Sequence, residues 1–277
     1  MIDSPRYRRE VQRASELARA AGALVVEIRD RGPLAVEHKA GDEPVTVADR
    51  AASELVVAGL RAAFPDDVIV SEESADDLAR ISARRVWYVD PIDGTKDFIR
   101  GGDGFSVMIG LCVDARPVMG VVYQPIGAGL FAAADDAGAW LSAPGLADRR
   151  LAVSDVTDVA AIRLVASKSH RSPVIDEVKS ALGISNELNI GSVGLKLALI
   201  ALGERDLYVN PWPKCKAWDT CAPEAILQAA GGTLTDTAGR PVRYDEVELG
   251  RLDGLVASNG RVHAAALARL ASLFPRR

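Results

Sequence analysis

The sequence predicts a layered protein in which an α+β N-terminal part is followed by an α/β C-terminal part. Apolar residues recur at helical spacing in the first 63 residues. The interval from Phe105 to Trp140 is rich in Val, Ile, Leu and Gly and has the turn spacing of an antiparallel meander. After about residue 160, strands alternate with helices, as in α/β layers. A weak boundary at 143–158 separates the expected units, 1–150 and 151–277.

Two helices precede the meander. Ser4 suits the N-cap and Pro5 the first position of a helix, and Gly32-Pro33 ends its apolar periodicity. The elements expected in this part are a helix from Ser4 to about residue 31, a helix over 48–63, and strands over 68–70 and 86–89.

The C-terminal part shows the alternation from which the α/β assignment follows. The elements expected there are strands over 162–166, 207–209 and 255–257, and helices over 173–182, 195–202, 222–230 and 261–273. Each helix carries apolar residues at three- and four-residue spacing, and each strand is a short apolar run.

The bulk composition excludes several classes of protein. A net charge of -5 over 277 residues argues against binding a nucleic acid polymer, which needs a basic face. No apolar run approaches the roughly 18 residues that span a bilayer, and the first ten residues lack the apolar region of a secretory signal. The three cysteines include no Cys-x-x-Cys pair, which is typical of reduced thiols. We therefore expect a cytoplasmic protein without stable membrane insertion.

The segment Asp90-Pro-Ile-Asp-Gly-Thr95 carries the strongest chemical signal. An apolar strand ends in two carboxylates three residues apart, and Pro91 bars a continuing strand between them. Two acids held so close repel each other unless a cation lies between them. The Gly-Thr turn behind them has the character of a phosphate seat. Because carboxylates with phosphate favour hard metal ions, the segment indicates Mg²⁺; taken alone, Asp93-Gly94 is also an ordinary turn.

Three further acidic sites have structural alternatives when taken singly. Glu72 follows a strand, where α/β proteins place ligand-binding groups, although an exposed acid there is commonly only solvated. Asp49 and Asp219 each stand where a helix start is expected, so each suits helix capping as well as catalysis.

Taken together, the acidic sites resemble a known family. The segments Pro44-Val-Thr-Val-Ala-Asp49, Glu72-Glu-Ser74, Asp90-Pro-Ile-Asp-Gly-Thr95 and Trp218-Asp-Thr-Cys-Ala222 occur in the order typical of the inositol monophosphatase-like superfamily. The resemblance spans about residues 6–270. It implies the layered αβαβα sandwich shared with fructose-1,6-bisphosphatase, and a Mg²⁺-dependent, lithium-sensitive phosphatase.

The same resemblance implies the roles of individual residues. Metal would be held by the carboxylates of Glu72, Asp90, Asp93 and Asp219 and by the carbonyl of Ile92, all hard oxygen donors for two or three Mg²⁺ ions. Thr95 and Asp49 would form the catalytic pair, with Glu72 beside them. Gly94 and Thr95 would bind the phosphate through their N–H groups.

Within the superfamily, Lys96-Asp-Phe98 resembles the 3′(2′),5′-bisphosphate nucleotidases of the CysQ type, whereas inositol monophosphatases have Thr-Asn-Phe there. Two further segments resemble that branch's nucleotide contacts, Ser167-Lys-Ser-His170 and Gly191-Ser-Val-Gly-Leu-Lys196. The resemblance implies that the substrate contacts are Gly94, Thr95, Ser167, His170, Ser192, Lys196 and Asp219. Val193 departs from the branch, which often has a hydroxyl residue there.

The leading hypothesis is a phosphoric monoester hydrolase of sulfur metabolism that converts 3′-phosphoadenosine 5′-phosphate (PAP) to AMP and phosphate. Its partner would be a small nucleotide. The first alternative is an inositol monophosphatase or another sugar- or alcohol-phosphate phosphatase. A second is a non-catalytic nucleotide-binding protein, which the complete ligand set and the Thr–Asp pair disfavour. Both a monomer and a homodimer are compatible with the sequence.

Overall fold

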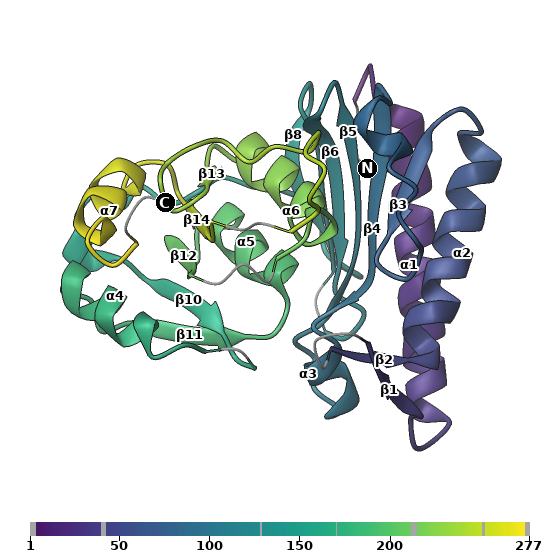
Figure 1. Ribbon diagram of the computed structural model, residues 1–277, viewed down its shortest axis with the longest axis horizontal. Helices are drawn as coiled ribbons and strands as arrows, with labels where there is room; N and C mark the ends of the chain where they lie inside the picture. Colours follow the sequence, from purple (N-terminus) through teal and green to yellow (C-terminus); the bar gives the residue numbers. More distant parts are fainter. Residues whose placement is uncertain are drawn as a thin grey trace.

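The computed structural model describes residues 4–39, 43–127, 129–169, 171–211, 215–250 and 253–274. Figure 1 shows five layers in the order helix, sheet, helix, sheet, helix, with α1 and α2 at one side and α4 and α7 at the other. This is the predicted αβαβα order. No helix in the described ranges is long and apolar enough to cross a bilayer.

The first sheet has seven strands in the order β3-β4-β5-β6-β7-β8-β9. Its first pair, β3 with β4, is parallel, and the remaining pairs are antiparallel. The strands are β3 (Val68–Ser71), β4 (Arg85–Asp93), β5 (Ser106–Val113), β6 (Arg116–Tyr123), β7 (Leu130–Ala134), β8 (Gly138–Ser142) and β9 (Arg149–Arg150). The antiparallel hairpin of β1 (Val36–His38) and β2 (Pro44–Thr46) stands apart from this sheet, and a short 3₁₀ turn spans Ala79–Ile81. Because β3 and β4 are parallel neighbours, their carboxyl ends meet at one edge of the sheet.

Helices α1 (Arg8–Asp30) and α2 (Val47–Ala63) cover the outer face of this sheet. Val11, Leu17 and Val25 of α1 and Val56 and Leu60 of α2 are buried there in one apolar cluster. This burial fixes α2, and with it Asp49, against the sheet whose strand β4 carries most of the motif segment 90–95.

The second sheet has five strands in the order β11-β10-β12-β14-β13. The strands are β10 (Leu164–Ser167), β11 (Glu187–Ile190), β12 (Leu207–Asn210), β13 (Thr233–Thr235) and β14 (Leu255–Ser258). Strand β10 is parallel to β11 and β12, whereas β14 is antiparallel to β12 and β13. Helices α4 (Val174–Leu182) and α7 (His263–Leu270) cover its outer face, and a 3₁₀ turn spans Val159–Ala161.

Helices α5 (Val193–Ala201) and α6 (Ala217–Ala229) lie between the two sheets. Helix α6 approaches the first sheet very closely, because a Cβ atom on Gly120 would lie 2.1 Å from the carbonyl oxygen of Ala222 and one on Gly110 would lie 2.6 Å from its nitrogen. Glycine is therefore required on β5 and β6. The contact brings the start of α6 beside the end of β4.

The structure corrects several predicted boundaries. Helix α7 spans His263–Leu270 rather than 261–273, and strand β10 spans Leu164–Ser167 rather than 162–166. Helix α1 begins at Arg8 rather than Ser4, because the Ser4 hydroxyl accepts a hydrogen bond from Tyr7 N (2.7 Å) and caps a preceding turn. Helix α6 begins at Ala217 rather than about Ala222, so Pro223 lies inside it. Strand β4 continues through Pro91 to Asp93, which the sequence argued against.

The continuation of β4 has a local cause. Pairing with β5 is regular up to Asp90 and resumes at Asp93 with a shift of register, so Pro91 lies in a bulge where no ladder hydrogen bond is needed. Strands β1, β2, β11 and β13 were missed. They mix polar with apolar residues and so lack the short apolar run that identified the equally short strands β3, β10, β12 and β14.

Candidate active site

The bulge in β4 orients two acids at one edge of the first sheet. The backbone N–H of Ile92 donates to Asp90 Oδ1 at 3.0 Å, which folds the segment between the two acids onto Asp90. Both carboxylates are buried. The bulge therefore places Asp90 and Asp93 at the same edge, although an unbroken strand would put residues three apart on opposite faces.

Gly94 begins the short helix α3 (Thr95–Ile99) with a φ of 97°, a left-handed conformation that favours glycine. A Cβ atom at this position would also lie 2.8 Å from the carbonyl oxygen of Gly104. The turn is thus closed to other residues for two reasons. Its effect is to put Thr95 directly beside the acidic edge.

Thr95 meets Asp49 across the gap between α3 and α2. The Thr95 hydroxyl lies 3.4 Å from Asp49 Oδ1 and 3.0 Å from the carbonyl oxygen of Ile92. Asp49 Oδ2 accepts from the backbone N–H and the hydroxyl of Thr46, at 2.7 and 2.6 Å. Burial raises the pKa of Asp49. Asp49 therefore does both things that the sequence left open: one oxygen caps α2 and the other faces Thr95.

Glu72 and Asp219 approach the same edge from two other elements. Glu72 follows β3, and its Oε1 lies 3.2 Å from the ammonium group of Lys39, which also pairs with Glu73. Asp219 lies in the first turn of α6, where its Oδ2 accepts from Lys216 N at 2.7 Å. Together with Asp90 and Asp93 they line one cleft of about 480 Å³ between the two sheets.

Crowding of these acids in a buried place raises their pKa values. Burial, followed by the neighbouring acids, raises the pKa of Asp90 well above its usual range. Burial is also the main cause that raises the pKa of Glu72 to about 8 and of Asp219 to about 7. Asp90 and Asp219 interact through their side chains, so the two carboxylates lie close together at this edge.

A divalent cation between these buried carboxylates would offset their mutual repulsion. All the donors are hard oxygens, as Mg²⁺ prefers. As the side chains stand in the described ranges, no three acids, histidines or cysteines form a ready metal-binding group. Protein donors hold one oxygen of each acid, through Ile92 N, Ser192, Lys216 N and Lys39. The set fits a metal chemically, because each of these four carboxylates keeps a second oxygen that these donors do not hold.

Two of the residues predicted to contact nucleotide have internal partners. The Ser192 side chain is fully buried; its hydroxyl donates to Asp93 Oδ2 at 2.5 Å and accepts from Leu195 N at 2.9 Å. Lys196 borders the cleft but is almost completely buried, and its ammonium group donates to the carbonyl oxygens of Gly191 (2.7 Å) and Ile190 (3.2 Å). Burial lowers the pKa of Lys196 to about 8.

The remaining predicted contacts are Ser167, which lines the cleft, and His170, which lies outside the described residues. Several residues of the site were not predicted. Lys39 pairs with Glu72, and the cleft is also lined by Lys96, Ser169, Tyr208, Asn210, Cys215, Lys216 and Trp218. The ends of β10 and β12 were the available signal for Ser169, Tyr208 and Asn210, since strand ends in α/β layers face ligands.

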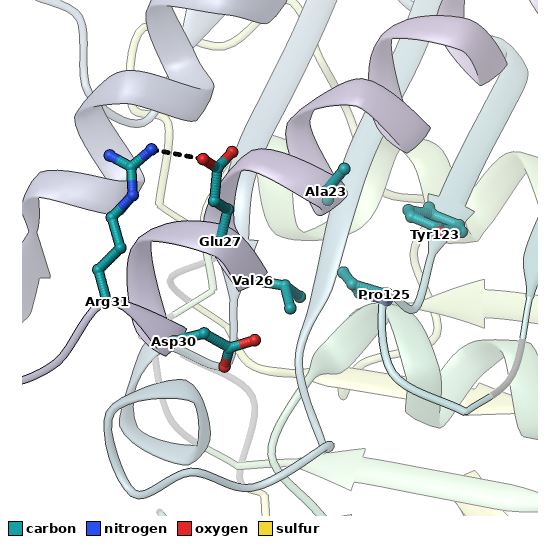
Figure 2. Close-up of a pocket in the computed structure, with 8 residues that line it drawn as sticks. Ala23, Val26, Glu27, Asp30, Arg31, Tyr123 and Pro125 are labelled. Carbon is teal, nitrogen blue, oxygen red and sulfur yellow. Dashed lines mark hydrogen bonds and ion pairs between the residues drawn. The ribbon is translucent and has the colours of Figure 1, made fainter.

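A larger hollow of about 740 Å³ lies elsewhere, along α1 (Figure 2). It is an open groove beside Tyr123 and Pro125. Its Glu27 is paired with Arg31 one turn further along the helix. It brings together neither the acids nor the hydroxyl groups described above, so the smaller cleft is the candidate active site.

Comparison with known proteins agrees with the motif order. The model of the inositol monophosphatase family matches residues 8–275. The chain belongs to the inositol monophosphatase family. It is 37% identical over 231 residues to the 3′(2′),5′-bisphosphate nucleotidase CysQ of Shigella flexneri, covering 83% of this chain and 91% of that one. It is 32% identical over 244 residues to the 3′-phosphoadenosine 5′-phosphate phosphatase of Mycobacterium leprae, covering 85% and 84%.

Its fold also matches that of a solved member of the inositol monophosphatase family, CysQ from Bacteroides thetaiotaomicron. The TM-score is 0.76 and the identity 30%, covering 92% of this chain and 98% of that one. The predicted family, its CysQ-type branch and the αβαβα fold are thereby confirmed.

Proposed function

We propose that this chain is a Mg²⁺-dependent phosphatase that removes the 3′-phosphate of PAP to give AMP and phosphate. Its similarity to bisphosphate nucleotidases supports the substrate. The observation that carries the hydrolytic part is the meeting of two groups in one cleft: buried acids of raised pKa, and the Thr95–Asp49 contact. The first group suits a cation and the second suits proton transfer, which are the two requirements for hydrolysing a phosphate ester with water.

In this proposal, the carboxylates of Glu72, Asp90, Asp93 and Asp219 and the carbonyl of Ile92 would hold Mg²⁺. The bound metal would lower the pKa of a water molecule and offset charge on the leaving oxygen. Asp49 Oδ1 faces the Thr95 hydroxyl and is the nearest base to it, so Asp49 accepts a proton while Thr95 orients the attacking water. A raised pKa suits Asp49 for this role, because it makes the carboxylate a stronger base.

The turn at Gly94 would orient the scissile phosphate. Gly94 is the N-cap of α3, and the first N–H groups of a helix have no partner within the helix, so these groups would bind phosphate oxygens. The wall formed by the ends of β10 and β12 would contact the retained nucleotide. Ser167, Ser169, Tyr208 and Asn210 supply polar groups there. The buried hydroxyl of Ser192 would position Asp93, its partner at 2.5 Å, instead of contacting the nucleotide.

The test is a substrate panel with purified protein and Mg²⁺. We expect kcat/KM for PAP to exceed that for inositol 1-phosphate by about 100-fold or more, because a site that binds two phosphates loses more than one contact with a monophosphate. Equal or reversed preference would leave the inositol or sugar phosphatase as the better account. Protein that is folded and binds nucleotide but turns over neither substrate would support a binding protein.

A further inference from the structure

A buried carboxylate with no role in the proposed reaction lies directly behind the cleft. Asp97, on α3, is two residues past Thr95, and its side chain is 1% exposed. Its cationic partner comes from the second sheet: the ammonium group of Lys168, just past the end of β10, lies 3.3 Å from Oδ1 and 3.4 Å from Oδ2. Oδ1 makes no hydrogen bond within the described residues. A buried carboxylate costs stability unless it is paired, so Lys168 is the group that compensates for its charge.

Two glycines enclose this carboxylate. A Cβ atom on Gly104 would lie 2.4 Å from Asp97 Oδ2, and one on Gly191 would lie 2.8 Å from the same oxygen. The backbones of the two glycine segments are themselves joined, since Ser192 N donates to the carbonyl oxygen of Gly104 at 2.9 Å. Gly104 precedes β5 of the first sheet and Gly191 follows β11 of the second. Asp97 thus lies at the junction where the segment before β5 contacts the segment after β11.

Both sides of the cleft are attached to this junction. The turn after Gly191 supplies Ser192 Oγ and Gly194 N, which donate to Asp93 Oδ2 at 2.5 and 2.8 Å. The backbone N–H of Lys168 donates to Ile190 at 3.0 Å, and the neighbours of Lys168, Ser167 and Ser169, line the cleft. A shift at the junction would therefore move the substrate-facing serines relative to the acidic edge.

We propose that Asp97 and Lys168 form a positioning pair that holds the 167–169 segment in register with the acidic edge, and that this pair favours substrates spanning both walls. The proposal rests on the proposed function. A bisphosphorylated nucleotide must contact the acidic edge with one phosphate and the opposite wall with its retained part. Its binding depends on the register of the two walls, whereas a small monophosphate bound only at the acidic edge is insensitive to it. Asparagine at position 97 would keep the shape but lose the charge that holds Lys168.

The experiment is a double-mutant cycle with Asp97→Asn, Lys168→Met and the combined variant, in saturating Mg²⁺. We expect each single substitution to raise KM for PAP roughly ten-fold and to leave kcat within about two-fold of the wild-type value. The KM of the combined variant should be no higher than that of the more impaired single variant. Lys168→Arg should restore most of the loss. KM for p-nitrophenyl phosphate should stay within about two-fold, because this compound does not span the cleft.

Arg163→Met is the matched control. Like Lys168, Arg163 is a partly exposed cation on a buried aspartate, Asp206, of the C-terminal part. The Arg163→Met substitution should lower the melting temperature and leave KM for PAP and KM for p-nitrophenyl phosphate unchanged. A lower melting temperature without a change in KM for PAP in the Asp97 and Lys168 variants would show a merely structural ion pair, and additive effects in the cycle would show that the two residues do not act together. Wild-type protein that does not hydrolyse PAP would instead refute the proposed function.

Discussion

The two walls of the cleft use their polar residues in opposite ways. On the wall formed by the first sheet, Asp90 and Asp93 line the cleft, and one oxygen of each carboxylate accepts a hydrogen bond from the protein. On the opposite wall, Ser192 and Lys196 turn their polar atoms to protein partners, although Lys196 still borders the cleft. The comparison shows that the function of a site can be read from the sequence where consecutive residues of one turn form it. It cannot be read where packing between distant segments decides which residues face the cleft.

Asp93→Asn gives the largest expected loss. The amide keeps the size of the side chain but removes a charge from the acidic edge, where the proposed reaction needs it. We expect kcat for PAP to fall on the order of 10³-fold. An unchanged circular dichroism spectrum and AMP binding would serve as the folding control. Activity within ten-fold of wild type would mean that this wall is not the catalytic one.

Asp49→Asn should come next. Loss of the proposed base is expected to lower kcat about 100-fold with little change in KM. The rising limb of the kcat–pH profile should disappear as well. In the wild type this limb should lie above the ordinary range of aspartate, because burial raises the pKa of Asp49 and a base acts only when deprotonated. A profile that is unchanged in the variant would assign the limb to another group.

Ser192→Ala tests the opposite wall. If the hydroxyl positions Asp93, Mg²⁺ affinity should fall roughly ten-fold, as for other outer partners of metal ligands. KM for PAP at saturating Mg²⁺ should stay near the wild-type value. Ser106→Ala is the control, because the Ser106 hydroxyl contacts Ser192 at 2.9 Å but does not hydrogen-bond to Asp93 in the described part of the structure. A raised KM with normal Mg²⁺ affinity would instead make Ser192 a nucleotide contact.

The smallest effect concerns stability and pH. Glu72, with an ordinary pKa of 4.5, titrates at about 8 in the fold, and Asp219 moves from 3.8 to about 7. Between these values the metal-free folded state binds more protons than the unfolded state, so its stability should fall as pH rises from about 4.5 to 8. Mg²⁺ should offset this loss. Thermal unfolding should therefore show a larger Mg²⁺-dependent rise in melting temperature at pH 8 than at pH 5.5; an equal rise would separate these acids from the metal site.

The contrast between the two walls explains what the sequence could predict. Asp90, Asp93, Gly94 and Thr95 are close in the chain, so a bulge and a turn suffice to arrange them. Their proximity could therefore be predicted without knowing the rest of the fold. The layers followed from helical periodicity and strand alternation. Short strands such as β1 and β11 lack the apolar run that identified equally short strands such as β10, and the start of α6 depended on Asp219 accepting a hydrogen bond from Lys216 N.

The opposite wall depends on contacts between distant segments. Whether Ser192 faces nucleotide or Asp93 is decided by residues 99 positions apart in the chain. The pairing of Asp97 with Lys168 is likewise a product of the junction between the sheets. In the sequence, Lys96-Asp-Phe98 indicates only the CysQ-type branch. In the structure, Asp97 of this segment lies at the junction between the sheets.

The most direct measurement is the identification of the products formed from PAP with Mg²⁺ and with excess chelator. We predict AMP and one equivalent of phosphate with Mg²⁺, no adenosine 3′-phosphate, and no turnover once the metal is chelated. Formation of adenosine 3′-phosphate, or turnover that persists in the chelator, would contradict a metal-dependent 3′-phosphatase at this cleft.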